Sequence, residues 1–308
     1  MSDVTEVVAP IFILIMLGYG GARTGRISGP ALAGMNDYVF WLATPALLFA
    51  SVTGATDLSV ARIAVAYFAA VILLYAAALA IGMRILALDL AGAAVFALNV
   101  TFGNTVMMGI PLVAAAFGPE GVANLIALVA FHSIVLLPVT TILLEIGQAE
   151  APSLFRTARA SVLALVRNPV ILGIVVALAW RLLDLPVPGV LRRFTELLGT
   201  SAPALALFCL GGSLAGFREP GGWRESLWAG GLKLFMLPAL VALAAGPVAG
   251  LSGIPYTVAV IVAALPTGAN AFVLARRYAT LADRSATTVV WTTTVSILTI
   301  GGLLVLLR

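Results

Sequence analysis

Residues 90–117 read LAGAAVFALNVTFGNTVMMGIPLVAAAF, and the architecture can be worked out from this stretch. As one continuous helix it would be about 42 Å long at about 1.5 Å per residue, whereas the apolar core of a bilayer is about 30 Å thick. Its middle also holds glycines, a proline and small polar residues: Asn99, Thr101, Gly103, Asn104, Thr105, Gly109 and Pro111. We therefore expect a membrane helix that breaks near Gly103 and continues beyond the break.

The composition of the whole chain supports a membrane setting. Of its 308 residues, 62% are hydrophobic and 10% are charged, and the mean hydropathy is +1.12. Soluble domains are about 45–50% apolar and about 25% charged, so a soluble or disordered chain is excluded. A net charge of +4 spread over this length is no basic patch, which argues against nucleic-acid binding.

Ten apolar stretches are long enough to be helical membrane segments. They are residues 7–22, 37–52, 63–83, 90–117, 123–144, 169–183, 194–214, 226–248, 256–275 and 286–307. The sequence therefore predicts an all-α integral membrane protein with ten transmembrane helices.

The two halves of the chain share landmarks. Pro10 and Pro169 open the first and sixth stretches, and Pro45 and Pro203 follow 35 and 34 residues later, each before Ala-Leu. Because each half has five helices, the second half would enter the membrane from the opposite side, as in many secondary transporters. The expected division is a first repeat at 1–145, a cytoplasmic linker at 146–168 and a second, inverted repeat at 169–308.

Arginine placement predicts the orientation. With the N-terminus outside, the connections on the cytoplasmic side carry most of the arginines: Arg23, Arg26, Arg84, Arg156, Arg159, Arg167, Arg218, Arg224, Arg276, Arg277 and Arg284. We expect a multi-pass protein of the cell (inner or plasma) membrane with both termini outside the cytoplasm.

The ninth stretch repeats the interruption of the fourth. Pro266, Thr267, Gly268 and Asn270 lie in its middle, as Gly103, Asn104 and Thr105 lie in the fourth. Two interrupted helices at matching positions point to a transporter binding site, and their half-helix N-termini suit an anion. The alternative is that these small residues only allow close helix packing. The expected substrate-binding residues are Asn104, Thr105, Gly103, Pro266, Thr267, Gly268 and Asn270.

Two ionisable residues fall inside predicted spans. His132 could bind a proton or a carboxylate, or it could be a neutral histidine bonded to a neighbouring helix. Lys233 could attract an anion, or it could extend to the cytoplasmic interface, which we favour. No P-loop or metal-spaced Cys/His cluster occurs, so we expect no enzyme activity, no cofactor and no bound metal.

The motifs around the two interruptions resemble a known family. Residues 104–112, NTVMMGIPL, are similar to the NTLVMGIPLL-type stretch of the auxin efflux carrier family, which includes plant auxin carriers and bacterial organic-acid carriers. Residues 264–268, ALPTG, followed by FVLA at 272–275, resemble its second-half motif ALPQG…FVFA, and residues 36–40 and 45–49 resemble its second helix. Gly103 stands where the family usually has proline, and Thr267 stands where it has glutamine.

The resemblance implies the fold of sodium/proton antiporters and bile-acid symporters. Helices one, two, six and seven would form a scaffold and a homodimer interface, and helices three to five and eight to ten a moving transport domain. It further implies an elevator-type carrier of a small organic anion, such as an auxin-like monocarboxylate or a dicarboxylate. The alternatives are a sodium- or proton-coupled symporter of another substrate class, or a channel- or sensor-like membrane protein.

Overall fold

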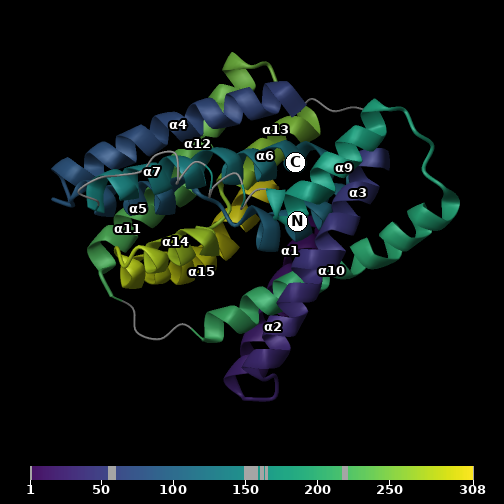
Figure 1. Cartoon of the computed structure of the whole chain (residues 1–308), viewed down its shortest axis with the longest axis horizontal. Coiled ribbons are helices and arrows are strands. Elements are labelled where there is room, and N and C mark those ends of the chain that lie inside the picture. The colour runs from purple at the N-terminus through teal and green to yellow at the C-terminus, as the bar shows by residue number, and fades with distance from the viewer. Residues whose placement is uncertain are drawn as a thin grey trace. The chain divides into compact units, whose positions relative to one another are not determined.

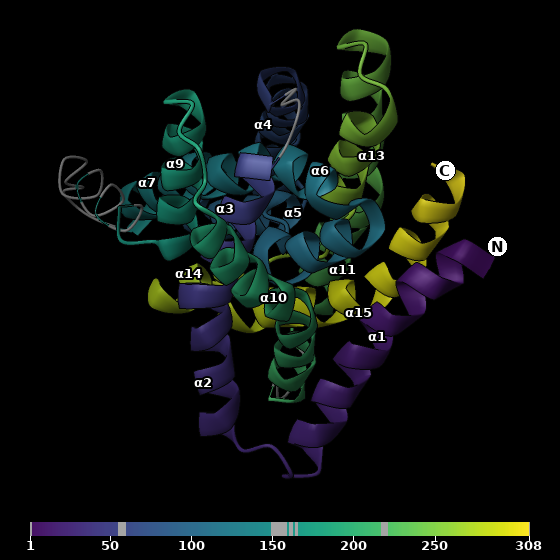
Figure 2. The same ribbon diagram turned by 90° about the vertical axis from the view of Figure 1, so that its right-hand side faces the viewer.

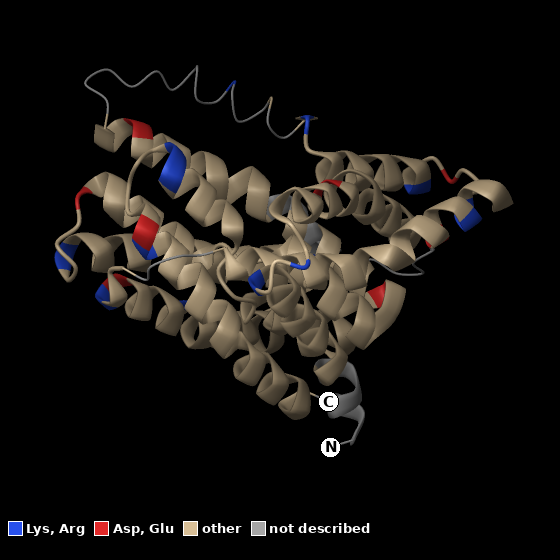
Figure 3. Cartoon of the chain, turned by 90° about the horizontal axis from the view of Figure 1, so that it is seen from below, with Lys and Arg blue, Asp and Glu red and all other residues tan. Residues whose placement is uncertain are grey.

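The computed structural model describes residues 2–54, 60–148, 159, 163, 166–216 and 221–307. Within these ranges the regular elements are helices, and the extended pairing is a single isolated bridge between Gly103 and Thr267. Charged residues lie mainly at helix ends and in connections (Figure 3). The described part of the chain is therefore all-helical, and the middle residues of its helices are mostly apolar, as the composition predicts.

Several described helices are long and apolar enough to cross a membrane. These five are Arg62–Arg84, Thr105–Ile126, Gly189–Ala215, Trp223–Val248 and Ala282–Leu306. Five further apolar helices are shorter: Ala9–Arg23, Leu90–Thr101, His132–Gln148, Pro169–Leu182 and Gly253–Ala263. Together they cover parts of nine of the ten apolar stretches, and none of them covers the second stretch, residues 37–52. Most of the predicted cytoplasmic linker, 149–158 and parts of 160–165, lies outside the described residues.

The chain divides into two compact units. The first contains Met1–Val60, Val106–Ala130 and Val166–Phe217, and the second contains Ala61–Thr105, Phe131–Leu165 and Arg218–Arg308.

The first unit is built on close helix packing. Helix α1 (Ser2–Arg23) packs along α10 (Gly189–Ala215), and α3 (Thr44–Gly54) packs against α9 (Pro169–Leu182) and α10. A short turn joins α1 to α2 (Gly29–Tyr38) at the bottom of Figure 2, and the π-helical turn η1 (Val39–Ala43) continues α2 into α3.

Glycines bring α1 and α10 into backbone contact. A Cβ added at Gly18 would overlap the carbonyl oxygen of Phe208, and one added at Gly211 would overlap that of Ile15. Small residues at a helix contact are typical of membrane helix pairs, because apolar lipid gives little hydrophobic drive and association depends on close packing.

Local signals in the sequence explain two helix boundaries in this unit. Asn168 caps α9, and its Oδ1 accepts from the backbone N–H of Val170 at 2.9 Å, while Pro169 occupies the first turn. Helix α6 (Ile110–Phe131) bends at Gly118, whose φ of 60° and ψ of −156° are non-helical. Gly118 therefore separates the fourth and fifth predicted stretches.

The second unit contains the remaining helices. They are α4 (Val60–Arg84), α5 (Leu90–Thr101), η3 (His132–Leu136), α7 (Leu137–Gln148), α11 (Trp223–Gly231), η4 (Leu232–Met236), α12 (Leu237–Leu243), η5 (Ala244–Val248), α13 (Gly253–Ala263), α14 (Ala269–Arg277) and α15 (Ala282–Leu306). Helix α5 packs against α7, and α15 packs against α11 and α14. Helices α14 and α15 lie side by side in Figure 1.

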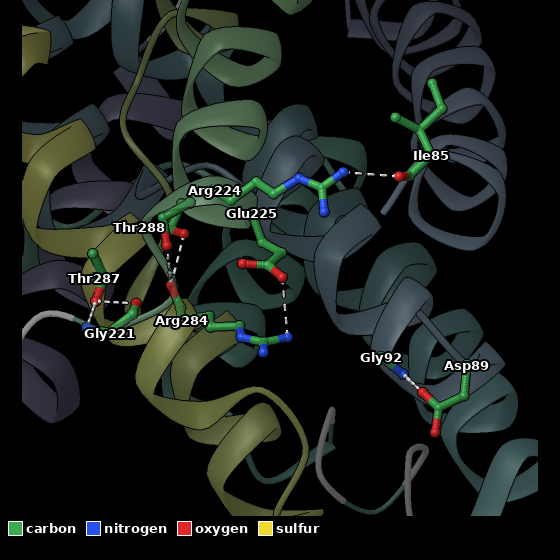
Figure 4. A network of polar contacts seen from close by, with 10 residues as sticks. Ile85, Asp89, Gly92, Gly221, Arg224, Glu225, Arg284, Thr287 and Thr288 are labelled. Carbon is green, nitrogen blue, oxygen red and sulfur yellow. Dashed lines mark hydrogen bonds and ion pairs between the residues drawn. The ribbon is translucent and has the colours of Figure 1, made fainter. Parts of the chain in front are cut away.

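Polar contacts hold the starts of α11 and α15 together (Figure 4). The Arg284 guanidinium lies 3.3 Å from Glu225 Oε1, and the Ser226 hydroxyl donates to the Arg284 carbonyl oxygen at 2.9 Å. Arg224 donates to the carbonyl oxygen of Ile85 just after α4. The middles of these helices carry few charged residues. The described ion pair of the second unit, between Arg284 and Glu225, therefore lies at the ends of helices.

A second group of contacts holds the connection between α14 and α15. The Tyr278 hydroxyl donates to Glu145 Oε1 at 2.8 Å, and the Gln148 amide donates to the Tyr278 carbonyl oxygen at 2.9 Å. Burial, followed by the hydrogen bond and the negative charge of Glu145, raises the pKa of Tyr278 to about 12, against a smaller opposing effect of Arg277. The phenol is therefore neutral and can donate at physiological pH.

Candidate functional site

Two helices of the second unit are interrupted where the sequence predicts breaks. Helix α5 ends at Thr101, and Phe102 is extended with φ −82° and ψ 105°. Helix α13 ends at Ala263, and α14 begins after Gly268, which is extended with φ −76° and ψ 143°. Pro266 has no N–H to continue a helical ladder, which favours the second break.

The two interruptions pair with each other. The backbone N–H of Asn104 donates to the Pro266 carbonyl oxygen at 2.8 Å, and the N–H of Gly268 donates to the Phe102 carbonyl oxygen at 2.9 Å. These bonds form the antiparallel bridge between Gly103 and Thr267. We call residues 102–105 and 264–268 the paired breaks. Pairing satisfies backbone groups that the interruptions free, which is a requirement inside a membrane.

Hydroxyl groups of α15 and an asparagine of α5 support the paired breaks. Thr267 Oγ1 donates to the Asn99 carbonyl oxygen at 2.8 Å, and the Thr267 N–H donates to Thr292 Oγ1 at 3.2 Å. Ser285 donates to Asn99 Oδ1 at 2.7 Å. All four residues are buried. The support therefore consists of neutral hydrogen bonds, which avoid the cost of an unpaired buried polar group.

Asn104 and Thr105 differ from these supporting residues. They are 5% and 3% exposed, and neither side chain makes a hydrogen bond to another residue in the described ranges. Among the described residues, the side-chain polar atoms that are enclosed without a partner are Asn124 Oδ1 and Trp180 Nε1. The Asn104 amide and the Thr105 hydroxyl therefore keep some accessible surface and are free to bond to a ligand. These two side chains are the strongest candidates for substrate contacts.

The other predicted site residues have different roles. Gly268 allows the close approach, because a Cβ there would lie 2.9 Å from both the Gly103 carbonyl oxygen and the Phe102 ring. Pro266 supplies the carbonyl oxygen that accepts from Asn104, and Thr267 is fully buried in the support. Asn270 is exposed in the first turn of α14, outside the paired breaks.

Lys233 lies beside the paired breaks. Its side chain is 0% exposed, and its Nζ donates to the Ala263 carbonyl oxygen, the last of α13, at 2.7 Å. A Cβ on Gly103 would lie 3.5 Å from this Nζ. The favoured expectation that Lys233 extends to the interface is therefore wrong, because the C-terminal end of α13 offers a buried acceptor within reach.

His132 is also buried and lies against the first break. Its Nε2 is 3.3 Å from the Tyr67 hydroxyl. The rings of Tyr67, Phe68 and Phe102 surround the imidazole, with centroids 5.4, 5.5 and 5.6 Å away. Since Phe102 belongs to the paired breaks, His132 contacts the site through that ring.

These candidates coincide with local changes of helix type. Thr105 begins η2 (Thr105–Gly109), His132 begins η3, and Lys233 lies in η4. Single π-helical turns inside α-helices are frequent at functional sites, because the extra residue redirects side chains.

Sequence reasoning missed the partners of the paired breaks. Ser285 and Thr292 bond across to residues far away in the chain, and a periodicity argument does not reveal such pairs. The available signal for Asn99 was its position three residues before the extended Phe102. Among the described residues, no group of three or more His, Cys, Asp or Glu side chains could hold a metal ion.

The fold and the paired breaks define a polytopic membrane protein with a polar site between interrupted helices. A family model described as "Membrane transport protein" matches residues 3–304, and the chain belongs to this family.

Full-length relatives carry transporter names. The chain is 28% identical over 312 residues to the "Putative malonate transporter" of Rhizobium meliloti (strain 1021), covering 100% of this chain and 97% of that protein. It is 26% identical over 359 residues to the "Probable auxin efflux carrier component 5a" of Oryza sativa subsp. japonica, covering 100% and 98%. Component 5c of the same plant is 24% identical over 364 residues, covering 96% and 95%. The resemblance to the auxin efflux carrier family is thereby confirmed.

Proposed function

We propose that this transporter moves a small organic anion by alternating access and binds it at the paired breaks. The observation that carries the proposal is the buried amide of Asn104, which has no partner in the described chain although the backbone around it is paired. A carrier needs groups that bind a substrate and release it again, and an unpaired amide meets that need.

The positive groups around this site favour an anionic substrate. Helix α14 starts directly after the second break, so its first N–H groups and partial positive charge face the interruption. The Lys233 amino group lies beside Gly103 and is a cation when it is protonated. No described residue from 99 to 105 or from 263 to 270 is acidic, so no local carboxylate opposes an anion.

The substrate class follows from the relatives' names. Malonate and auxin are the substrates in those names, and both carry carboxylates. We propose a short carboxylate for this chain, with malonate as the first compound to test.

The mechanism that we propose is an elevator in a homodimer of the cell membrane, with both termini outside the cytoplasm. Two inverted repeats, 1–145 and 169–308, would supply a scaffold from helices one, two, six and seven and a mobile domain from the others. One supporting observation is that α1, α2, α3, α9 and α10 fall in the first unit, while α4, α5, α7 and α11–α15 fall in the second. Residues 106–130 group with the first unit, so the chain passes from the second unit to the first directly after residue 105.

Proteoliposomes test the proposal. A carrier gives saturable uptake of labelled malonate or indole-acetate and counterflow when unlabelled substrate is preloaded. A channel gives linear uptake without counterflow, and a sensor gives no flux. Uptake with and without sodium, at two external pH values, separates the coupled alternatives. Absence of saturable flux for every carboxylate tested would reject the proposed function.

A further inference from the structure

The Lys233 ammonium is incompletely compensated. An ammonium has three N–H donors, and the structure gives Lys233 one acceptor, the Ala263 carbonyl oxygen. Among the described residues the one ion pair within 4.0 Å joins Arg284 to Glu225. Lys233 is therefore a fully buried cation without a carboxylate partner in the described part of the chain.

The titratable groups on neighbouring helices do not supply that partner. Helices α5 and α12 have none, and α13 has Tyr256 in its first turn. In α11, Glu225 precedes Lys233 by about 12 Å of helix, at about 1.5 Å per residue, and it pairs with Arg284 from the start of α15. The other charged groups of these helices, Arg224 and Asp283, also lie in first turns.

Such a cation is stable only when a negative charge compensates it. The C-terminal end of α13 supplies about half a charge through its last carbonyls. A carboxylate at the paired breaks would supply the rest, because a Cβ on Gly103, within those breaks, would lie 3.5 Å from the Lys233 Nζ. When the site is empty, a neutral amine costs less in a dry interior than an unpaired ammonium.

We propose that Lys233 takes up one proton each time the paired breaks bind an anion, so that one proton moves with each anion. On the entry side, the Nζ lone pair accepts a proton from water as the carboxylate binds. On the exit side, the carboxylate leaves and Nζ returns the proton to water. Binding of each favours the other, as linkage requires. This proposal rests on the proposed function, and Lys233 acts in it through its charge.

Calorimetry on the purified full chain measures the proton directly. Malonate is titrated near pH 8 in two buffers of different ionisation enthalpy. The carboxylates of malonate then contribute few protons. Wild type is expected to take up about one proton per bound malonate. Lys233→Arg, whose guanidinium stays charged, is expected to bind malonate without proton uptake. Lys233→Met is expected to bind at least tenfold more weakly.

The outcomes separate this proposal from the proposed function. If malonate binds to wild type without proton uptake, or if Lys233→Arg still takes up a proton, the proton coupling is rejected while the carrier stands. Loss of uptake in His132→Gln with retention in Lys233→Arg would assign the proton to His132 and reject it as well. If no carboxylate binds or is carried, the proposed function fails and this proposal fails with it. Should the Lys233 variants not fold, wild type and His132→Gln decide. Uptake that is absent from wild type or lost in His132→Gln rejects the proposal, and uptake kept in both supports it.

Discussion

The backbone N–H of Asn104 donates to the carbonyl oxygen of Pro266 at 2.8 Å. This bond joins the interruption in the first half of the chain to the interruption in the second half. It fixes the Asn104 backbone while leaving its side-chain amide unpaired. The same contact therefore holds the two interruptions together and leaves free the side-chain group that we assign to substrate.

Gly268→Ala should damage the protein, and Gly103→Ala is its matched control. A Cβ at Gly268 would lie 2.9 Å from a backbone oxygen and from the Phe102 ring, whereas a Cβ at Gly103 would meet its nearest neighbour at 3.5 Å. Overpacking of this kind costs about 1–3 kcal/mol. Unfolding in detergent should show a clearly lower apparent Tm for Gly268→Ala than for Gly103→Ala. Equal Tm values would contradict the close approach.

Thr267→Val should destabilise the second unit by about 1–2 kcal/mol, because it keeps the shape of threonine but removes the 2.8 Å hydrogen bond to Asn99. Thr267→Ser keeps the hydroxyl and should retain most of this stability. The free energy of unfolding of both variants decides between a hydrogen-bonding role and a purely steric one. Similar losses in the two variants would show that the methyl group matters instead.

Gly18→Ala should weaken the packing of α1 on α10, since its Cβ would overlap the Phe208 carbonyl oxygen. The loss is expected to be about 1–3 kcal/mol or more. Gly20→Ala, two residues along the same helix, has nothing within 4 Å and should be neutral or stabilising by up to about 1 kcal/mol. Thermal unfolding compares the two, and a harmless Gly18→Ala would refute the backbone contact.

Tyr278→Phe should cost about 1 kcal/mol through loss of the bond to Glu145. The pKa of Tyr278 is raised to about 12, above its ordinary value of about 10, so the folded state favours the neutral phenol. Its contribution is fully present below about pH 10 and is lost as the pH rises through about 12. The stability difference between wild type and Tyr278→Phe should therefore be constant from pH 6 to pH 9. A difference that shrinks within that range would disprove the assigned pKa direction.

The sequence predicts those features that depend on local chemistry. Gly103 and Pro266 lower the local cost of interrupting a helix. Asn168 before Pro169 starts a helix for reasons confined to one turn. Lys233 was misjudged because a lysine two turns into a helix can reach either the interface or a buried acceptor, and only the folded chain shows the Ala263 carbonyl oxygen. The bond from Ser285 to Asn99 spans 186 positions, so no local pattern could reveal it. Asn270 belongs to the same motif as Thr267, yet it lies in the first turn of α14, where its side chain is exposed.

The central claim, that the paired breaks bind the transported anion, is tested most directly by the affinity of Asn104→Ala for the carboxylate that wild type carries fastest. The control is Asn36→Ala, which removes an amide bonded to the Leu32 carbonyl oxygen in the first unit. Equilibrium binding should show at least a tenfold weaker affinity for Asn104→Ala and an unchanged one for Asn36→Ala. The ligand-free Tm of Asn104→Ala should stay within about 2 °C of wild type, because its side chain bonds to no other described residue. Wild-type affinity in Asn104→Ala would contradict the account.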